Sequence, residues 1–368
     1  MKTLAALALL LAAVPSRAAS RARPNIVFLD ICSARADHFG VYGYKRDTTP
    51  RLDRLARRAA VFENAMSQSS WCLPNYASLF TGQRPENHGL YTNVPTGIPR
   101  FETTLAEKLK EGGYETAAFS GGVYEIPAWG LSRGFDTYVN IFSTSTPDRV
   151  PAPVEDNMKA VGSWLKGRGK QKPFFLYLAI DNLHVPYRAS HPDEYAKKLP
   201  GPPLPKEDFG VPFDRAYNGE TSGYPPETKA AVAAFKKDPN ALKRYVARYD
   251  AAVNDVDGQI GVLIARLKKA GLYGNTILII TGDHGEMLGE HGLLGHTEGL
   301  YQPVLHVPLI VRDPRAPGSY GRRYGQLIER VDMMPTILSM ASVGYAGLPL
   351  SGKSFLPVLE DPHAPWRR

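Results

Sequence analysis

Two side chains that can bind a metal ion stand next to each other in the chain, directly after a run of apolar residues. Asp283 and His284 follow Thr276–Gly282, in which β-branched residues predominate. A run of this kind is typical of a buried strand. The same arrangement occurs near the N-terminus, where residues 25–29, which are apolar from Ile26 on, lead into Asp30. Carboxylates and imidazoles at such positions can bind a divalent cation.

The two strand ends can belong to one site although they are distant in sequence. In an open parallel sheet, ligands bind outside the carboxyl ends of the strands. Asp30 and Asp283 would then face a single crevice. The alternative is that both are ordinary turn or cap residues, because Asp is common at such positions.

A third segment, residues 69–82, lies between these strands and contains the motif Cys-Leu-Pro-Asn-Tyr, which begins at Cys72. This motif and the Asp-His-Gly-Glu motif that begins at Asp283 together resemble the sulfatase family of the alkaline-phosphatase-like superfamily. The resemblance extends over about residues 24–359. The two motifs are its specific parts, and the helices between them add little.

The resemblance implies an α/β fold with an alkaline-phosphatase-like, mostly parallel central sheet, helices on both of its faces and an abbreviated C-terminal subdomain. The alternation of predicted strands and helices also favours an α/β sheet. The predicted strands are residues 25–30, 115–120, 173–180, 276–282 and 307–312. The predicted helices are residues 50–59, 103–111, 155–166, 239–270 and 331–341, and a short helix is expected from Asn75.

Residues 1–18 have the pattern of a secretory signal peptide, in which Lys2 precedes an apolar stretch and small residues lead to a cleavage site after Ala18. The stretch is too short to span a bilayer as a helix, and no later run is long enough. We therefore expect an exported protein, periplasmic or secreted, with no membrane span; an uncleaved anchor is the alternative. Residues 19–312 are predicted to form the catalytic domain, and residues 313–368 a short C-terminal extension.

The chain carries a formal net charge of +8 at pH 7, which favours an anionic substrate. It contains no dense Lys/Arg tract, so we expect no nucleic-acid partner. The sequence does not indicate an oligomeric state.

The resemblance implies a metal site formed by Asp30, Cys72, Asp283 and His284. A divalent cation offsets the negative charge with which a sulfate or phosphate ester repels a nucleophile. Carboxylate oxygens favour Ca²⁺ or Mg²⁺, whereas the imidazole shifts the preference toward Mn²⁺ or Zn²⁺. The expected ion is Ca²⁺, with Mg²⁺ or Mn²⁺ as alternatives. The family often has two adjacent carboxylates at the first strand end, but Ile31 follows Asp30 in this chain.

Cys72 matches the position that sulfatases oxidise to formylglycine, the nucleophile of the family. Tyr76 stands where the recognition motif has arginine, so conversion of Cys72 is uncertain from the sequence. A thiolate nucleophile is one alternative, favoured if Cys72 lies near a helix N-terminus. The second alternative is a disulfide with Cys32, the other cysteine of the chain, which would remove the nucleophile.

Three further residues receive roles from the resemblance. His184 would contact the leaving group or a substrate oxygen, His296 would contact the oxyanion or act as general acid, and Asn93 would bind the substrate. Glu286 and Glu290 are expected to take no direct part in the chemistry. The Pro- and Gly-rich segment 184–227 is expected to form a wall of the substrate pocket.

The sequence thus predicts an exported, metal-dependent hydrolase that cleaves sulfate esters of small anionic molecules or glycans with residue 72 as nucleophile. One alternative keeps the fold and the metal but uses phosphate or phosphonate esters. Another is a catalytically degenerate member that binds anionic glycans, since Ile31, Tyr76 and a missing Gly-Lys-Trp-His segment after residue 120 depart from the family pattern.

Overall fold

The computed structural model describes residues 22–93, 96–125, 127–141, 154–169, 172–201, 204, 210–220, 223–297 and 299–366. The predicted signal peptide lies outside the described residues. Among the helices in these ranges, none has the length and apolar character needed to cross a membrane.

The core of the protein is an eight-stranded sheet with the strand order β10-β2-β9-β6-β1-β5-β3-β4. Only β9 runs antiparallel to its neighbours, so the sheet is mostly parallel, as the sequence predicts. The strands are β1 (Asn25–Ile31), β2 (Ala60–Met66), β3 (Glu115–Ser120), β4 (Thr137–Asn140), β5 (Phe174–Ile180), β6 (Thr276–Gly282), β9 (His306–Arg312) and β10 (Arg323–Glu329). A separate two-stranded hairpin consists of β7 (Met287–Leu288) and β8 (Leu294–Gly295).

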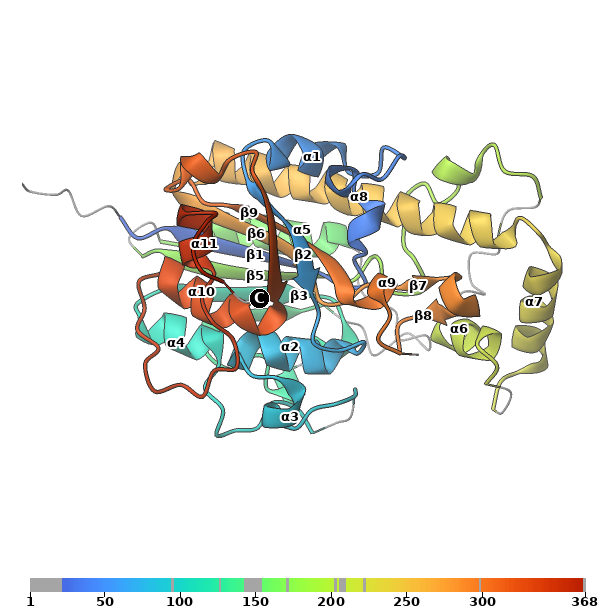
Figure 1. The fold of residues 1–368 in the computed structure, drawn as a ribbon, viewed down its shortest axis with the longest axis horizontal. Helices are drawn as coiled ribbons and strands as arrows, with labels where there is room; N and C mark the ends of the chain where they lie inside the picture. Colours follow the sequence, from blue (N-terminus) through green and yellow to red (C-terminus); the bar gives the residue numbers. More distant parts are fainter. Residues whose placement is uncertain are drawn as a thin grey trace, which may run out of the picture.

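Helices cover both faces of the sheet (Figure 1). One face packs against α1 (Pro50–Ala56), α5 (Val154–Gly167) and the long α8 (Ala241–Lys269). The other packs against α2 (Cys72–Thr81), α4 (Leu105–Glu111), α10 (Met333–Met340) and α11 (Leu356–Glu360). The central strands β1, β5 and β6 are buried along their whole length, as expected for parallel strands covered on both sides.

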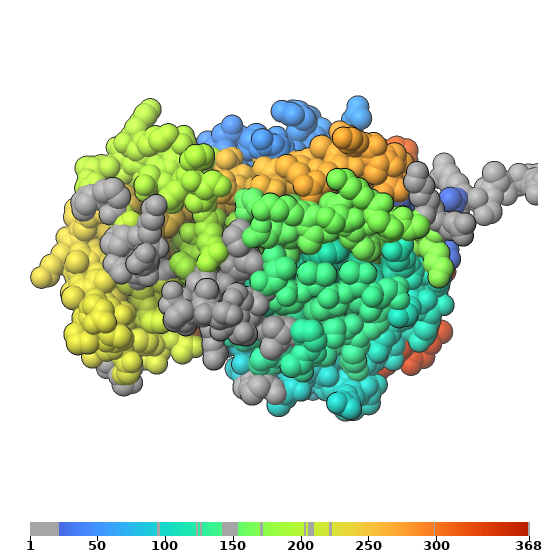
Figure 2. Space-filling model, turned by 180° about the vertical axis from the view of Figure 1, so that it is seen from behind, coloured from blue at the N-terminus to red at the C-terminus, as the bar shows by residue number. Residues whose placement is uncertain are grey.

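The remaining helices are α3 (Pro85–His88), α6 (Val211–Tyr217), α7 (Pro226–Lys237) and α9 (Gln302–Leu305). α6 lies within the predicted pocket-wall segment and packs against the β7–β8 hairpin, where Asn218 and Leu294 exchange two hydrogen bonds of 2.8 Å. The region of α6 and α7 forms one end of the molecule and is seen from behind in yellow-green to yellow in Figure 2.

The C-terminal residues belong to the main sheet. β10 pairs in parallel with β2 at the sheet edge, and α10 and α11 contribute to the same core as α2. This strand brings Arg330, the residue that directly follows it, to the edge where the other parallel strands end.

Candidate active site

The candidate residues come from one edge of the main sheet, the edge at which its parallel strands end. Cys32 follows β1, Asp283 and His284 follow β6, and His184 comes shortly after β5. Cys72 is the first residue of α2, which follows β2. This edge is the place where α/β sheets bind their ligands.

Cys72 begins α2, so its side chain lies at the positive end of the helix dipole. Its neighbour Leu73 donates its backbone N–H to Oδ1 of Asn93 at 2.9 Å, which ties the segment after α3 to the start of α2. The structure therefore brings Asn93 next to the predicted nucleophile. There its Oδ1 supports the start of the helix.

Three imidazole rings lie around the Cys72 thiol. Nε2 of His284 is 3.2 Å from Sγ of Cys72. One ligand atom each of Cys72, His184 and His296 lies within 4.8 Å of the other two. The rings of His284 and His296 are stacked with their centroids 4.3 Å apart.

In each of these rings Nδ1 is engaged elsewhere. Nδ1 donates to the carbonyl oxygen of Gly285 in His284 and to that of Val185 in His184, both at 2.8 Å. A carbonyl oxygen only accepts, so these contacts fix Nδ1 as the protonated nitrogen. Nε2 of each ring is then the atom that can serve the site.

In His296 the partner of Nδ1 is the buried carboxylate of Glu286, whose two oxygens lie at 3.1 and 3.3 Å. We expected Glu286 to take no direct part in the chemistry. In the structure its carboxylate contacts His296, a predicted catalytic residue, and can orient the ring. Glu290 faces away and forms an ion pair with Arg35 at 2.8 Å.

Glu286→Gln is expected to lower kcat by about 10- to 100-fold with little change in KM, because the neutral amide no longer fixes the His296 ring or its tautomer. The measurement is steady-state hydrolysis of an aryl sulfate. Glu290→Gln is the matched control from the same loop and should stay within about twofold of wild type, since its ion pair is partly solvated. Equal effects of the two substitutions would argue against a positioning role for Glu286.

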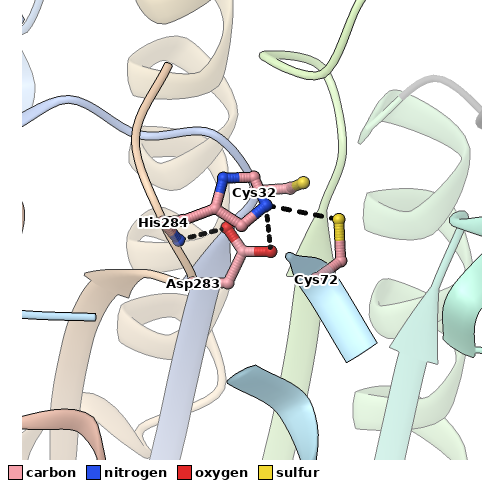
Figure 3. Close-up of side chains that lie close together, drawn as sticks. All are labelled: Cys32, Cys72, Asp283 and His284. Carbon is pink, nitrogen blue, oxygen red and sulfur yellow. Dashed lines mark hydrogen bonds and ion pairs between the residues drawn. The ribbon is translucent and has the colours of Figure 1, made fainter. Parts of the chain in front are cut away.

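Asp283 is fully buried and its two oxygens differ. Oδ1 accepts backbone N–H groups from Ser33 at 3.0 Å and from His284 at 2.6 Å. Within the described structure Oδ2 accepts no hydrogen bond, and it lies 3.4 Å from Nε2 of His284. Figure 3 shows both Asp283 contacts with His284 beside the thiol of Cys72.

Asp30, the fourth predicted metal ligand, does not join this group. Its carboxylate is fully buried and accepts two hydrogen bonds from the guanidinium of Arg330, one of them 3.0 Å long, and a third from the hydroxyl of Tyr177 at 3.0 Å. The reason lies in the strand end. β1 continues through Ile31, and the amide of Cys32 still bonds to the carbonyl of Ile180, so Asp30 lies within the sheet.

Cys32 takes the place at the strand end instead. Ligand atoms of Cys32, Cys72, Asp283 and His284 all lie within 4.8 Å of one another, and all four residues are buried. Both cysteines are free thiols in the structure. Because side chains alternate along a strand, Cys32 follows Asp30 on the same side of the sheet, and this period of two was the available sequence signal.

These contacts determine the charge state of the thiol. A hydrogen bond from Cys32 and the charges of the nearby imidazoles hold the pKa of Cys72 well below its usual range. Burial alone would lower the pKa of His284, but Asp283 and Cys72 raise it to about 10. The Cys72 thiol likewise raises the pKa of His184 to about 9 against the effect of burial. These contacts therefore favour the thiolate form of Cys72 and the protonated forms of His284 and His184, which is an environment that attracts an anion.

Tyr76, in place of the arginine of the family motif, is buried and close to two carboxyl groups. Burial raises the pKa of Glu125 well above its usual range, despite a hydrogen bond from Tyr76. Burial also raises the pKa of Asp181 to about 7. At this position the chain thus supplies a neutral phenol beside carboxyl groups where family members have a cation.

The fold and this constellation define an α/β protein whose candidate site has a thiol at a helix N-terminus and metal-compatible side chains beside it. The Sulfatase family model matches residues 24–343 of the chain. An arylsulfatase of Clostridium perfringens is 26% identical, with 94% of this chain and 80% of that protein covered. A multifunctional alkaline phosphatase superfamily protein of Trinickia caryophylli is 27% identical over 87% of this chain and 73% of its own length.

Solved structures show the same fold. A protein in complex with its substrate D-glucosamine-2-N,6-O-disulfate superimposes with a TM-score of 0.75 at 23% identity, over 94% of this chain and 82% of that one. A phosphonate monoester hydrolase of Agrobacterium radiobacter gives 0.70 at 20% identity, over 94% and 79% of the two chains.

The chain belongs to the sulfatase family, which assigns it to the sulfuric ester hydrolases. This family generally uses a divalent metal ion and formylglycine. Oδ2 of Asp283, which accepts no hydrogen bond within the described structure, fits a divalent ion together with the cluster around it. Cys72 lies where the residue that becomes formylglycine would be needed.

Proposed function

We propose that the protein hydrolyses sulfate monoesters of anionic small molecules or glycans, with the side chain at position 72 as the nucleophile. The observation that carries this proposal is the placement of Cys72 at the N-terminus of α2 with three imidazole nitrogens directed at it. A bound divalent ion would be held by Asp283, His284 and residue 72, and would polarise the sulfate oxygens.

The reaction requires cleavage of the ester with one proton transfer, followed by release of sulfate from residue 72. The nucleophilic atom of residue 72 attacks sulfur, the bond from sulfur to the ester oxygen breaks, and the electron pair stays on that oxygen. His184 donates the proton that this oxygen needs, because it is the less buried of the two candidate donors and its Nδ1 is held by the carbonyl of Val185, which leaves Nε2 for the site. His296, held by Glu286, contacts the sulfate oxygens. In the second step the bond that holds sulfate to residue 72 breaks. If residue 72 is a thiolate, water attacks sulfur and the thiolate leaves; if it is formylglycine, sulfate is eliminated and water hydrates the aldehyde again. The products are the alcohol and sulfate.

The proposal includes export after cleavage of the signal peptide, so the mature chain would begin at Ala19. N-terminal sequencing of protein from the periplasm or the medium of the native host tests this. A mature chain that still begins at Met1 would contradict it.

The reaction class is tested by assaying purified protein on three substrates: 4-nitrophenyl sulfate, 4-nitrophenyl phosphate and the 4-nitrophenyl monoester of phenylphosphonate. The leaving groups are matched, so the series compares transfer from sulfur with transfer from phosphorus. We expect the highest kcat/KM on the sulfate. Preference for either phosphorus ester would contradict the proposal.

Hydrolysis of phosphate or phosphonate monoesters is the second candidate. The observation in its favour is Tyr76, which replaces the arginine of the formylglycine recognition motif beside a thiol that is already ionised. An unmodified thiolate can form and release a thiophosphate ester through the same displacement.

His184→Asn is expected to lower kcat/KM by about 10²- to 10⁴-fold on an alkyl sulfate, because the departing alkoxide then lacks its proton donor. The loss should be much smaller on 4-nitrophenyl sulfate, whose leaving group needs no proton. The measurement is the ratio of the two losses. His191→Asn, an exposed histidine of the same segment, is the control. Equal losses on both substrates would assign His184 to sulfate binding instead.

A further inference from the structure

The strand ends of β1 and β6 place a thiol where a carboxylate was expected. Ile31 pairs with Gly282 in the register of the two parallel strands, so the residues that follow, Cys32 and Asp283, leave adjacent strands side by side. The amide of Cys32 bonds to the carbonyl of Ile180 at 2.9 Å, and Ser33 donates its amide to Asp283. These backbone contacts fix both side chains before any ligand binds.

Asp30 cannot serve as the missing oxygen ligand. Its two oxygens accept hydrogen bonds from the buried guanidinium of Arg330, which also donates to the carbonyl of Gly282 at 3.0 Å. The positive charge that a metal ion would give this carboxylate is already supplied by an arginine. The group that remains at the end of the sheet has two sulfurs, one imidazole nitrogen and one carboxylate oxygen.

One oxygen of this group accepts no hydrogen bond. Oδ2 of Asp283 is fully buried, and within the described structure its contact is the 3.4 Å ion pair with Nε2 of His284. A buried carboxylate oxygen with no hydrogen bond is incompletely satisfied, and a bound cation would complete its contacts. This observation is independent of the two cysteines and points to the same place.

The separations fit a small tetrahedral ion. Bonds of about 2.0–2.3 Å around such an ion place neighbouring ligand atoms about 3.3–3.8 Å apart. The distance of 3.4 Å from Nε2 of His284 to Oδ2 of Asp283 lies in this range, and the distance of 3.2 Å from the same nitrogen to Sγ of Cys72 lies just below it. Nδ1 of the same ring donates to a backbone carbonyl, the support that metal-binding imidazoles usually have.

The donor types exclude a calcium-like site. Ca²⁺ takes six to eight oxygen ligands, whereas thiolate and imidazole select zinc-like ions. We propose that Cys32 is a direct metal ligand and that Cys32, Asp283, His284 and the side chain at position 72 form a tetrahedral site for a zinc-like divalent ion. This inference deepens the proposed function by naming the ion class, but the binding it describes needs no substrate.

Cobalt(II) is the probe, because thiolate ligands give it a charge-transfer absorption in the near ultraviolet. The protein is reduced and its residue 72 is shown by mass to be cysteine. Since the chain has only two cysteines, a thiolate signal can come from Cys32 and Cys72 alone. We expect one equivalent of cobalt to give this band, and Zn²⁺ but not Ca²⁺ to displace it.

Cys32→Ser should reduce the charge-transfer intensity by about half and weaken Zn²⁺ binding at least tenfold, because one of two thiolates is lost. Cys32→Asp should add a carboxylate and give a Ca²⁺-dependent rise in melting temperature of at least about 2 °C, which wild type lacks. His291→Ala, an exposed histidine outside the cluster, is the control for adventitious binding and should leave the spectrum unchanged.

Full charge-transfer intensity in Cys32→Ser, or wild-type protein that prefers Ca²⁺, would overturn the inference. So would a Cys32–Cys72 disulfide in protein isolated from the native host. These readings are made without ester substrate. Absence of sulfatase activity with an intact cobalt spectrum would therefore overturn the proposed function alone.

Discussion

Cys72→Ala lowers kcat for sulfate-ester hydrolysis by about 10⁴-fold or more, the effect expected when the atom that attacks sulfur is removed. No described side chain other than Cys72 combines a position at the N-terminus of α2 with contact to His284. The kcat that remains should reflect only the catalysis that the other site residues provide by binding the substrate and stabilising its charge. The measurement is kcat on 4-nitrophenyl sulfate with metal supplied in excess.

Two measurements show whether the loss of activity comes from the missing nucleophile or from loss of the fold. In the metal-free protein, circular dichroism and melting temperature should change little, because alanine is small and has a higher helix propensity than cysteine at the start of α2. The mass of the peptide that contains residue 72, taken from active wild-type protein, shows whether the attacking group is a thiolate or formylglycine. A Cys72→Ala variant that keeps more than about a tenth of wild-type kcat would exclude residue 72 as the nucleophile.

The sequence predicts the central strands well because they are buried on both faces and are rich in β-branched and aromatic residues. The predicted strands 115–120 and 276–282 coincide with β3 and β6. The edge strand β10 was not predicted as a strand, because its exposed and buried residues alternate irregularly and its pairing with β2 contains a register shift. Its place in the sheet depends on a partner far away in the chain, which local pattern cannot show.

Some residues of the candidate site could be predicted from the sequence, and others could not. Asp283, His284 and Cys72 were identified because each stands in a motif that marks a strand or helix end. Arg330 has no such motif, and its partner Asp30 is 300 residues away in sequence. The predicted strand ends at residue 30 whereas β1 ends at Ile31, so the side chain that stands beside Asp283 and His284 is that of Cys32 and not that of Asp30. At a strand end an error of one or two residues changes which side chain faces the ligand.

The ion pair between Arg330 and Asp30 gives the largest expected effect on stability. Arg330→Met leaves the Asp30 carboxylate buried without its charged partner, and we expect the free energy of unfolding to fall by about 3–5 kcal/mol. The loss also includes the hydrogen bond from Nε of Arg330 to the carbonyl of Asn75 at 2.8 Å, which ties the segment after β10 to α2. Urea denaturation of the metal-free protein measures the change directly.

The double variant Asp30→Leu, Arg330→Met separates the burial of an unpaired charge from the loss of packing. Replacing both partners by apolar residues removes the buried charge, so at least about half of the lost stability should return. The same variant bears on the role of Asp30 in the site. If Asp30 were a metal ligand, the double variant would lose its cobalt spectrum while recovering its stability. If Arg330 is the cation that neutralises Asp30, as the contacts indicate, the folded double variant keeps the thiolate-to-cobalt band.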